Sequence, residues 1–492
     1  MNLRLPRTLV TLCCIAAFGL ARGAVGGEQQ IHRLLAVGDS ITEGGKTFSN
    51  YLYPLWEKLF AAGYLVEFVG SRSSESRIGP LRHEGYGGKN AEFLAVALQR
   101  NFRTNYADIV LIHAGHNHTN TEAPVAGIVA ATEAMIRTAR SLNPKVIAMV
   151  AQVIPSGKLP KYEYIPELNA ALGELARKLN TRQSPVLAVD MADGFDWRTD
   201  TIADRVHPNA RGAEKMAAKW FAALTKVMAA PPQTFQPRLV PYKKVKDAEL
   251  VLHVFSPPIT ATDKPRPAIV FFFGGGWTTG TPIQFYSECA HFAAKGFVAI
   301  SADYRIASVH GTSPFESVAD GKSAIRWVRQ HAAELGVDPN RIVAAGASAG
   351  GQVAAAAGIV SGLDEPGEDW SVSSRPNALV LWYAVIDNGP AGYGPPVVKA
   401  RYREISPLHN VTSNAPPTLL MLGTEDKYIP VATAEEFQRR LKQAGVRSEL
   451  RLFSGAGHPI YEWRKGASPF RDQLTALADA FLAGSGFDAP RR

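Results

Sequence analysis

Two blocks of alternating strand and helix patterns constrain the fold of this chain more than any other feature. In the first block, 31–228, short apolar runs alternate with longer stretches of helical spacing. Such runs are typical of buried parallel strands, and the stretches between them are typical of crossover helices. We expect strands at 34–37, 109–113, 146–150 and 186–189, and helices at 51–60, 128–142 and 165–179. The block therefore predicts an α/β domain with helices on both faces of a parallel sheet.

The second block, 242–486, follows a proline-rich segment, 229–241, that we interpret as a linker because its prolines interrupt regular structure. The prolines are Pro231, Pro232, Pro237 and Pro241. The alternating stretch 250–255 predicts a half-exposed antiparallel strand. Further strands are expected at 268–273, 298–301, 342–345, 378–382 and 418–422, with helices at 317–335, 432–444 and 473–482. A chain of 492 residues is long enough for two such domains, each with its own core.

The N-terminal segment 1–24 has the pattern of a secretory signal peptide. Arg4 and Arg7 precede an apolar run, 9–20, and the small residues Ala21, Gly23 and Ala24 follow. The run is short for a bilayer span, so we expect a secreted or periplasmic protein with no membrane partner after cleavage. Only Cys289 would then remain, which excludes an internal disulfide, and we expect it to be a small buried residue.

The charge balance is modestly positive. The formal net charge is +9, and the basic residues are scattered along the chain. No basic stripe with interleaved aromatic residues is present, so we expect no nucleic-acid partner.

A first catalytic constellation centres on Ser40. Gly38-Asp39-Ser40 directly follows the first expected strand, which places the serine where a strand gives way to a helix. Helix N-termini offer free N–H groups and a positive dipole end that stabilise an oxyanion. Asp204 and His207 lie three residues apart, so the carboxylate can orient the imidazole that activates Ser40.

Two further residues fit an oxyanion hole for this serine. Gly88 follows two other glycines and offers a backbone N–H, while Asn117 follows an expected strand and offers a side-chain amide. Each element alone is common in turns and loops. Together, each at a strand end, they indicate a serine hydrolase.

The first block resembles the SGNH, or GDSL, hydrolase superfamily over nearly all of its length. The resemblance implies a flavodoxin-like α/β/α sandwich, with Ser40 as nucleophile, Asp204 and His207 as acid and base, and the oxyanion donors named above. The motifs at 38–44 and 83–86 resemble members that deacetylate carbohydrates. His118 stands where the family often has aspartate, which affects the loop beside Asn117 but no catalytic position.

A second constellation centres on Ser348. Gly346-Ala347-Ser348-Ala349-Gly350 lies between an expected strand and an alanine-rich helical stretch, as in a nucleophile elbow. Upstream, Gly275 and Gly276 follow another strand and can present N–H groups to a substrate oxygen, alongside the N–H of Ala349. Asp426 and His458 come later, in the order expected for this arrangement. Glu425 competes for the acid role, and position favours Asp426.

The second block resembles the α/β-hydrolase superfamily, in its branch of small esterases with a triple-glycine oxyanion loop. The resemblance implies that fold and is close to esterases that act on acetylated or feruloylated plant polysaccharide. Many relatives have histidine where this chain has Phe273. Since the glycine N–H groups bind the oxyanion, activity should survive, although the bracing of the loop should differ.

Three functional hypotheses follow. The first is a bifunctional serine carbohydrate esterase that removes acetyl or feruloyl esters from polysaccharide or oligosaccharide without metal or cofactor. The second is a pair of general esterases for lipid or aryl esters. The third makes one domain a carbohydrate-binding module. Trp56, Trp197 and Trp277 are candidates for stacking on sugar rings, but a structural role is the more common one for such residues.

Overall fold

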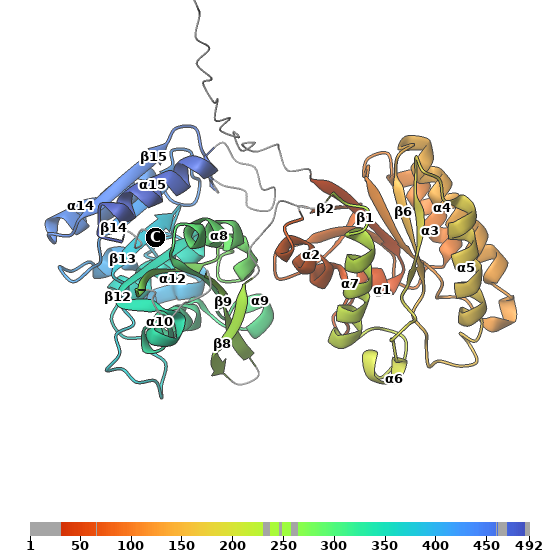
Figure 1. Ribbon diagram of the computed structural model, residues 1–492, viewed down its shortest axis with the longest axis horizontal. Coiled ribbons are helices and arrows are strands. Elements are labelled where there is room, and N and C mark those ends of the chain that lie inside the picture. The colour runs from red at the N-terminus through yellow and green to blue at the C-terminus, as the bar shows by residue number, and fades with distance from the viewer. Residues whose placement is uncertain are drawn as a thin grey trace, which may run out of the picture.

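The computed structural model describes residues 31–64, 66–229, 237–245, 248–256, 264–458, 460 and 470–487. The expected signal peptide, 1–24, lies outside these residues. Figure 1 shows two α/β units side by side. In the part of the chain that the structure describes, no helix has both the length and the apolar character to cross a membrane.

The first unit is built on a sheet in the order β3-β4-β1-β5-β6-β7, with β2 also paired to β1. All described pairings are parallel except β3–β4, so the sheet is mixed rather than fully parallel. Its strands are β1 (His32–Gly38), β2 (Val66–Val69), β3 (Arg72–Ser74), β4 (Leu81–Gly85), β5 (Ile109–His113), β6 (Ile147–Gln152) and β7 (Val186–Asp190).

Helices cover both faces of this sheet, as the sequence predicts. The helices are α1 (Ser40–Glu43), α2 (Leu52–Ala61), α3 (Ala91–Asn101), η1 (Asn120–Glu122), α4 (Val125–Leu142), α5 (Ile165–Leu179), α6 (Trp197–Asp200) and α7 (Ala210–Leu224). Buried residues of α3, α4 and α5 form one core with the sheet, and those of α2 and α7 belong to another. Figure 1 shows α2 on the side that faces the second unit. Apolar packing on both sheet faces fixes the strand ends that carry the polar loops.

The second unit is an eight-stranded sheet in the order β15-β14-β13-β12-β10-β11-β9-β8. Strands β8 and β9 are antiparallel at one edge and the rest are parallel. The strands are β8 (Arg238–Val245), β9 (Ala248–Phe255), β10 (Arg266–Phe272), β11 (Val298–Ala302), β12 (Val337–Ala347), β13 (Ala378–Trp382), β14 (Thr418–Gly423) and β15 (Ser448–Phe453).

Its helices lie between successive parallel strands, except α15, which follows β15. They are η2 (Pro282–Phe285), α8 (Tyr286–Ala294), α9 (Ala307–His310), α10 (Pro314–Gln330), α11 (Ala332–Leu335), α12 (Ser348–Ile359), α13 (Pro395–Val398), η3 (Lys399–Glu404), η4 (Pro407–Asn410), α14 (Val431–Gln443) and α15 (Arg471–Ala483). Helix α12 packs on β12, β13 and α10, so its first residue lies in the middle of the sheet. Cys289 in α8 is fully buried, as expected.

The C-terminal boundary predicted for the linker, residue 241, is wrong. Arg238 already belongs to β8, and Pro241 lies within that strand, paired with Val251. Proline lacks an N–H and is tolerated here because β8 is an edge strand whose register shifts between Pro241 and Lys243. The second domain therefore begins before residue 242.

The single helix expected over 317–335 is divided in two. Helix α10 ends at Gln330, and a short α11 follows. His331 leaves helical geometry, its ring stacks on Trp327 at 3.9 Å, and its Nδ1 lies 2.9 Å from the Trp327 carbonyl oxygen. A side chain that bonds a carbonyl one turn back offers the chain an alternative to continuing the helix.

Candidate active sites

Ser40 is the first residue of α1, directly after the central strand β1. Asp39 caps this short helix, and its Oδ1 accepts the Ile41 N–H at 2.9 Å. The cap leaves the Ser40 side chain at the carboxyl edge of the parallel strands. Ligands of open α/β sheets bind at this edge, where the strand order reverses direction.

The structure brings Ser40, His207 and Asp204 together in the predicted order. Ser40 Oγ lies 2.8 Å from His207 Nε2, and His207 Nδ1 lies 2.5 Å from Asp204 Oδ2. The other carboxylate oxygen of Asp204 accepts the N–H groups of Val206 and His207 at 2.9 and 3.0 Å. Burial opposes ionisation of Asp204, but these hydrogen bonds, with the one from the His207 side chain foremost, hold its pKa below the ordinary value.

The loop that carries the acid and base is anchored by the loop that follows β6 in the same domain. The Arg205 carbonyl accepts the Gly157 N–H and the Ser156 hydroxyl, both at 2.9 Å. Phe48 stacks on the His207 ring with centroids 4.1 Å apart. These contacts hold the imidazole in one orientation, as a general base requires.

Asp39, which precedes Ser40, is buried together with two histidines, His113 and His116. His113 and His116 stack with ring centroids 5.9 Å apart, and His116 Nδ1 lies 3.9 Å from Asp39 Oδ2. Burial raises the pKa of Asp39 to about 6 and lowers the pKa of His113 to about 4 and that of His116 to about 3. These histidines were not predicted from the sequence, and their positions within and just after a strand are the signal that could have found them.

The two predicted oxyanion donors of this site lie on neighbouring loops. Asn117 has φ +67°, a conformation that asparagine tolerates, and its Nδ2 donates to the Lys89 carbonyl at 3.0 Å. Gly88 precedes Lys89, and a Cβ placed on Gly87 would lie 3.8 Å from Ser40 Cβ. The loops therefore meet at the nucleophile, and the donor roles of Gly88 and Asn117 remain predictions.

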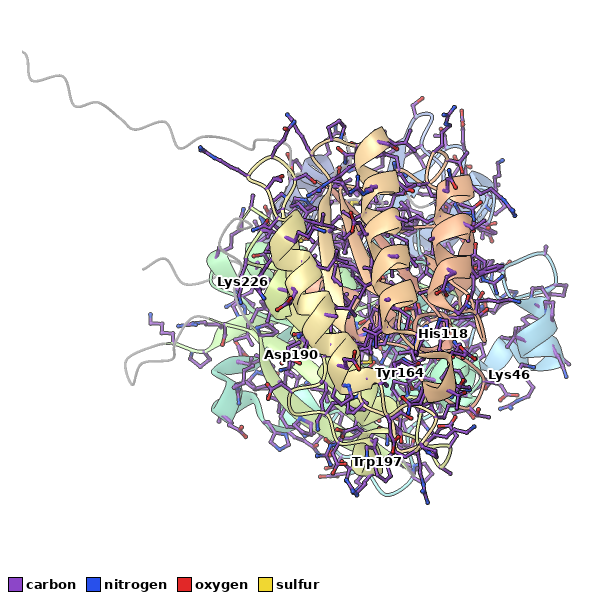
Figure 2. All side chains as sticks on the ribbon, turned by 90° about the vertical axis from the view of Figure 1, so that its right-hand side faces the viewer. Lys46, His118, Tyr164, Asp190, Trp197 and Lys226 are labelled. Carbon is purple, nitrogen blue, oxygen red and sulfur yellow. The ribbon has the colours of Figure 1, made fainter. Side chains whose placement is uncertain are left out.

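His118, the departure from the family pattern, is held by two carboxylates. Its Nδ1 lies 2.9 Å from Glu122 and its Nε2 lies 3.0 Å from Glu92 of α3. Tyr164 bonds the Gly115 carbonyl at 2.8 Å in the same loop. Figure 2 shows His118 and Tyr164 near each other on the side of the molecule formed by the first domain. The loop beside Asn117 is therefore fixed by hydrogen bonds to two carboxylates, where the family often has aspartate.

Ser348 begins α12 with φ +53°, a strained backbone for a residue with a side chain. The turn depends on glycine on both sides. A Cβ on Gly346 would lie 2.5 Å from the Gly350 carbonyl oxygen, and a Cβ on Gly350 would lie 2.1 Å from the oxygens of Phe272 and Phe273. These close backbone approaches explain why a small residue stands at each position.

Ser348, His458 and Asp426 also lie in the predicted order. Ser348 Oγ is 2.9 Å from His458 Nε2, and His458 Nδ1 is 2.7 Å from Asp426 Oδ2. The Asp426 side chain is fully buried, and its Oδ1 accepts the N–H groups of Tyr428 and Ile429 at 2.8 and 3.0 Å. Asp426, and not the exposed Glu425, therefore faces the histidine.

The glycine loop lies against the second nucleophile. A Cβ on Gly274 would lie 3.3 Å from Ser348 Cβ. The Gly274 N–H donates to Gln284 Oε1 at 2.6 Å, which leaves Gly275 and Gly276, both at positive φ, as the predicted donors on this loop. Ala349 follows Ser348 in the first turn of α12, where N–H groups have no helical partner. The roles of these three N–H groups remain predictions.

Comparisons with known proteins agree with the division into two domains. Residues 36–215 match the GDSL-like Lipase/Acylhydrolase family, and residues 252–441 match the BD-FAE family. The chain joins a GDSL-like domain to an α/β-hydrolase esterase domain. The GDSL-like domain carries Ser40, and the α/β-hydrolase domain carries Ser348.

Among curated relatives, Esterase LipC of Mycobacterium tuberculosis is 34% identical over 226 residues, which cover 40% of this chain and 53% of that protein. Carboxylesterase NlhH of the same organism is 36% identical over 149 residues, which cover 30% of this chain and 44% of that one. The chain spans about half the length of these curated relatives. The apo form of Thermogutta terrifontis esterase 2 is 41% identical with a TM-score of 0.50, and the match covers 54% of this chain and 100% of that one.

The α/β-hydrolase domain has an aromatic group beside its triad that the sequence analysis missed. The Tyr428 ring lies edge-on to the rings of His458 and Tyr393, with centroids 5.1 and 5.7 Å apart. The Tyr393 ring in turn contacts the Trp277 ring, with centroids 5.6 Å apart. Tyr428 is 56% exposed, whereas Trp277 is buried with its Nε1 donating to Gln352. The position of Tyr428 two residues after Asp426 is the signal that could have found it.

The tryptophans considered for sugar stacking have mainly structural roles. Trp56 and Trp277 are 2% exposed, as the more common role predicts. Trp197, labelled in Figure 2, is partly exposed, and the guanidinium groups of Arg198 and Arg205 lie over its ring at 4.3 and 5.7 Å.

Proposed function

We propose that the chain is an exported, bifunctional serine carbohydrate esterase that removes acetyl esters, and feruloyl esters at the second site, from polysaccharide or oligosaccharide. The observation that carries the proposal is the presence of two separate serine–histidine–aspartate chains of hydrogen bonds. Each serine stands at the carboxyl end of a central parallel strand, and both domains belong to families of acylhydrolases or esterases.

The geometry supports an acyl-enzyme mechanism in each domain. His207 or His458 takes the hydroxyl proton through Nε2 as the serine oxygen attacks the ester carbonyl. The oxyanion of the tetrahedral intermediate accepts hydrogen bonds from the predicted donors, and the histidine returns the proton to the leaving sugar hydroxyl. Water then repeats the sequence and releases the acid. The aspartates keep the Nδ1–H tautomer and stabilise the imidazolium.

The exposure of the two sites supports large, polar substrates. In the first site, the side chains of His207 and Asp204 are 23% and 38% exposed, so the triad lies in an open position that a polymer chain can reach. In the second, the exposed Tyr428 ring beside His458 offers an apolar face to a sugar or an aryl acid. The signal-peptide pattern at 1–24 supports export to where such polymers occur.

The test is acetate release from acetylated xylan by wild type, Ser40→Ala, Ser348→Ala and the double variant. Partial activity in each single variant and none in the double variant is the expected result. The matched control is Ser361→Ala, since this exposed serine follows α12 and has no place in either triad. No acetate release by the wild type, together with hydrolysis of lipid esters, would refute the proposal.

A second candidate is the hydrolysis of lipid or small aryl esters. Relatives named as an esterase and a carboxylesterase favour it, and Thermogutta terrifontis esterase 2 has been solved in a form phosphoramylated by tabun. Rates with p-nitrophenyl esters of increasing acyl length separate the candidates. A steep fall beyond acetyl favours sugar esters, and a maximum at longer chains favours lipids.

A non-catalytic carbohydrate-binding role for one domain finds less support. Such a role would be favoured by a broken triad, yet in both domains serine, histidine and aspartate lie within hydrogen-bonding distance. Affinity electrophoresis of the two single serine variants on xylan, combined with the acetate assay, would show binding without turnover if one domain only bound.

A further inference from the structure

Arg77 of the GDSL-like domain reaches the oxyanion loop of the α/β-hydrolase domain. It stands in the turn between β3 and β4, and its Nε donates to the Gly280 carbonyl at 2.7 Å. The Gly280 N–H in turn donates to the Arg77 carbonyl, and an Arg77 Nη donates to Asp303. One residue of the first domain therefore satisfies both backbone groups of Gly280.

Gly280 closes the tight turn that holds the predicted oxyanion donors. The Gly275 carbonyl accepts the N–H groups of Thr278 and Thr279 at 3.1 and 3.0 Å. Gly280 has φ +117°, and a Cβ there would lie 2.3 Å from the Gly274 carbonyl oxygen. The end of the loop thus packs directly on its beginning, so a shift of Gly280 would move Gly275 and Gly276.

Arg77 also braces the start of the loop. Its guanidinium lies over the Phe273 ring, 5.5 Å from the centroid, and the Tyr304 ring also stacks on Phe273 with centroids 4.1 Å apart. The Tyr304 hydroxyl donates to the Phe273 carbonyl at 2.5 Å, and Asp303 accepts the Tyr304 N–H at 3.0 Å. Phe273 stands where many relatives have histidine, and here its ring is enclosed partly by a side chain of the other domain.

The hairpin that carries Arg77 is itself firmly held. At its base, the Ser74 hydroxyl donates to the Glu43 carbonyl and lies 2.6 Å from His83 Nε2. The Glu43 carboxylate pairs with Arg72 and accepts the Gly87 N–H at 2.6 Å. The Arg77 side chain is 16% exposed, and that of Asp303 is 13% exposed, so water screens their ion pair weakly.

We propose that Arg77 is a positioning residue for the Ser348 site: it acts from the neighbouring domain to hold the loop 274–280 so that the Gly275 and Gly276 N–H groups point at the substrate oxygen. The inference rests on ester hydrolysis at Ser348 but not on the identity of the sugar or acyl group. It makes the GDSL-like domain part of the structure that the second active site requires.

Because the protein has two nucleophilic serines, the effect of one substitution on kcat can be measured separately at each site. With p-nitrophenyl acetate as the probe, a Ser40→Ala background reports the Ser348 site and a Ser348→Ala background reports the Ser40 site. Because small displacements of catalytic groups cost up to about a hundredfold, Arg77→Ala should lower kcat at the Ser348 site by about tenfold or more, with KM little changed. It should leave the Ser40 site near its parent rate. Arg82→Ala, an exposed arginine of β4, is the matched control and should change neither.

Arg77→Lys provides a second variant that keeps the charge beside Asp303 but lacks the Nε donor to Gly280. Intermediate kcat at the Ser348 site is expected, and it supports the proposal even if Arg77→Ala folds poorly. A folded Arg77→Ala protein with the parent's kcat at the Ser348 site would overturn the inference, as would equal losses at both sites. If Ser40→Ala/Ser348→Ala still turned over the probe at the Ser40→Ala rate, the assignment of Ser348 itself would fail and the inference with it.

Discussion

Gly350→Ala should disable the Ser348 site through the backbone alone. The new Cβ would lie 2.1 Å from the carbonyl oxygens of both Phe272 and Phe273, whereas ordinary contacts begin near 3.4 Å. More than an ångström of separation must therefore be gained between α12 and the end of β10. The oxyanion loop continues from that end, so the shift moves Ser348 away from its donors. Overpacking of this kind costs about 1–3 kcal/mol of stability, and an ångström of misplacement costs about a hundredfold in rate.

The assay is hydrolysis of p-nitrophenyl acetate in the Ser40→Ala background, with thermal unfolding measured in parallel. We expect kcat to fall by about a hundredfold while the protein remains folded. Gly173→Ala in α5 is the control, because a Cβ there meets only the flexible end of Gln152, at 3.2 Å, and alanine favours the helix. A Gly350→Ala protein with the parent's kcat would refute the argument that backbone contact fixes this serine.

Three further predictions concern single side chains. Burial lowers the pKa of His113 in the folded protein to about 4. Between about pH 6.5 and 4 this histidine is therefore protonated in the unfolded chain but not in the folded protein, so the free energy of unfolding should fall as the pH falls through this range. His113→Leu should therefore reduce the loss between pH 7.5 and 4.5 by about 2–3 kcal/mol in urea unfolding, and an unchanged loss would contradict the assignment. Asp426→Asn should lower kcat at the Ser348 site by about 10³–10⁴-fold. Asp204→Asn should lower kcat at the Ser40 site by less, because water can reach the 38% exposed Asp204 side chain but not the buried Asp426 side chain. Equal losses of kcat at the two sites would oppose this reasoning. Tyr428→Ala should raise KM for aryl esters several-fold with kcat little changed, whereas Tyr428→Phe should behave as wild type in the same steady-state assay.

Periodicity predicted those elements whose burial is simple. The expected strand 109–113 and helix 165–179 match β5 and α5 at both ends because continuous apolar runs and amphipathic faces fill both sides of the sheet. The short strands β3 and β4 were not expected, since β3 is Arg-Ser-Ser and β4 is Leu-Arg-His-Glu-Gly, which has neither an apolar run nor an alternating pattern. Their pairing depends on a neighbouring strand and on Glu43, which lies far away in sequence.

The order of triad residues could be inferred from sequence because each follows an expected strand or turn. What the sequence could not supply is contact between residues that no local pattern relates. Arg77 stands in a polar turn, and nothing in its surroundings indicates that it bonds Gly280, more than 200 residues away, in the other domain. The same holds for the contacts of Tyr428 with Tyr393 and with His458, which join residues from separate loops.

The two domains position a nucleophilic serine and its acid and base in different ways. Ser40 follows an aspartate cap, and its acid and base share one anchored turn, so the triad needs no strain at the serine and stays partly open to water. Ser348 has φ +53°, with its acid after β14 and its histidine after β15, so strand packing has to bring three loops together and buries the acid. A triad assembled from three loops depends more on distant packing than one built on a single turn. The second site should therefore be the more sensitive of the two to substitutions outside it.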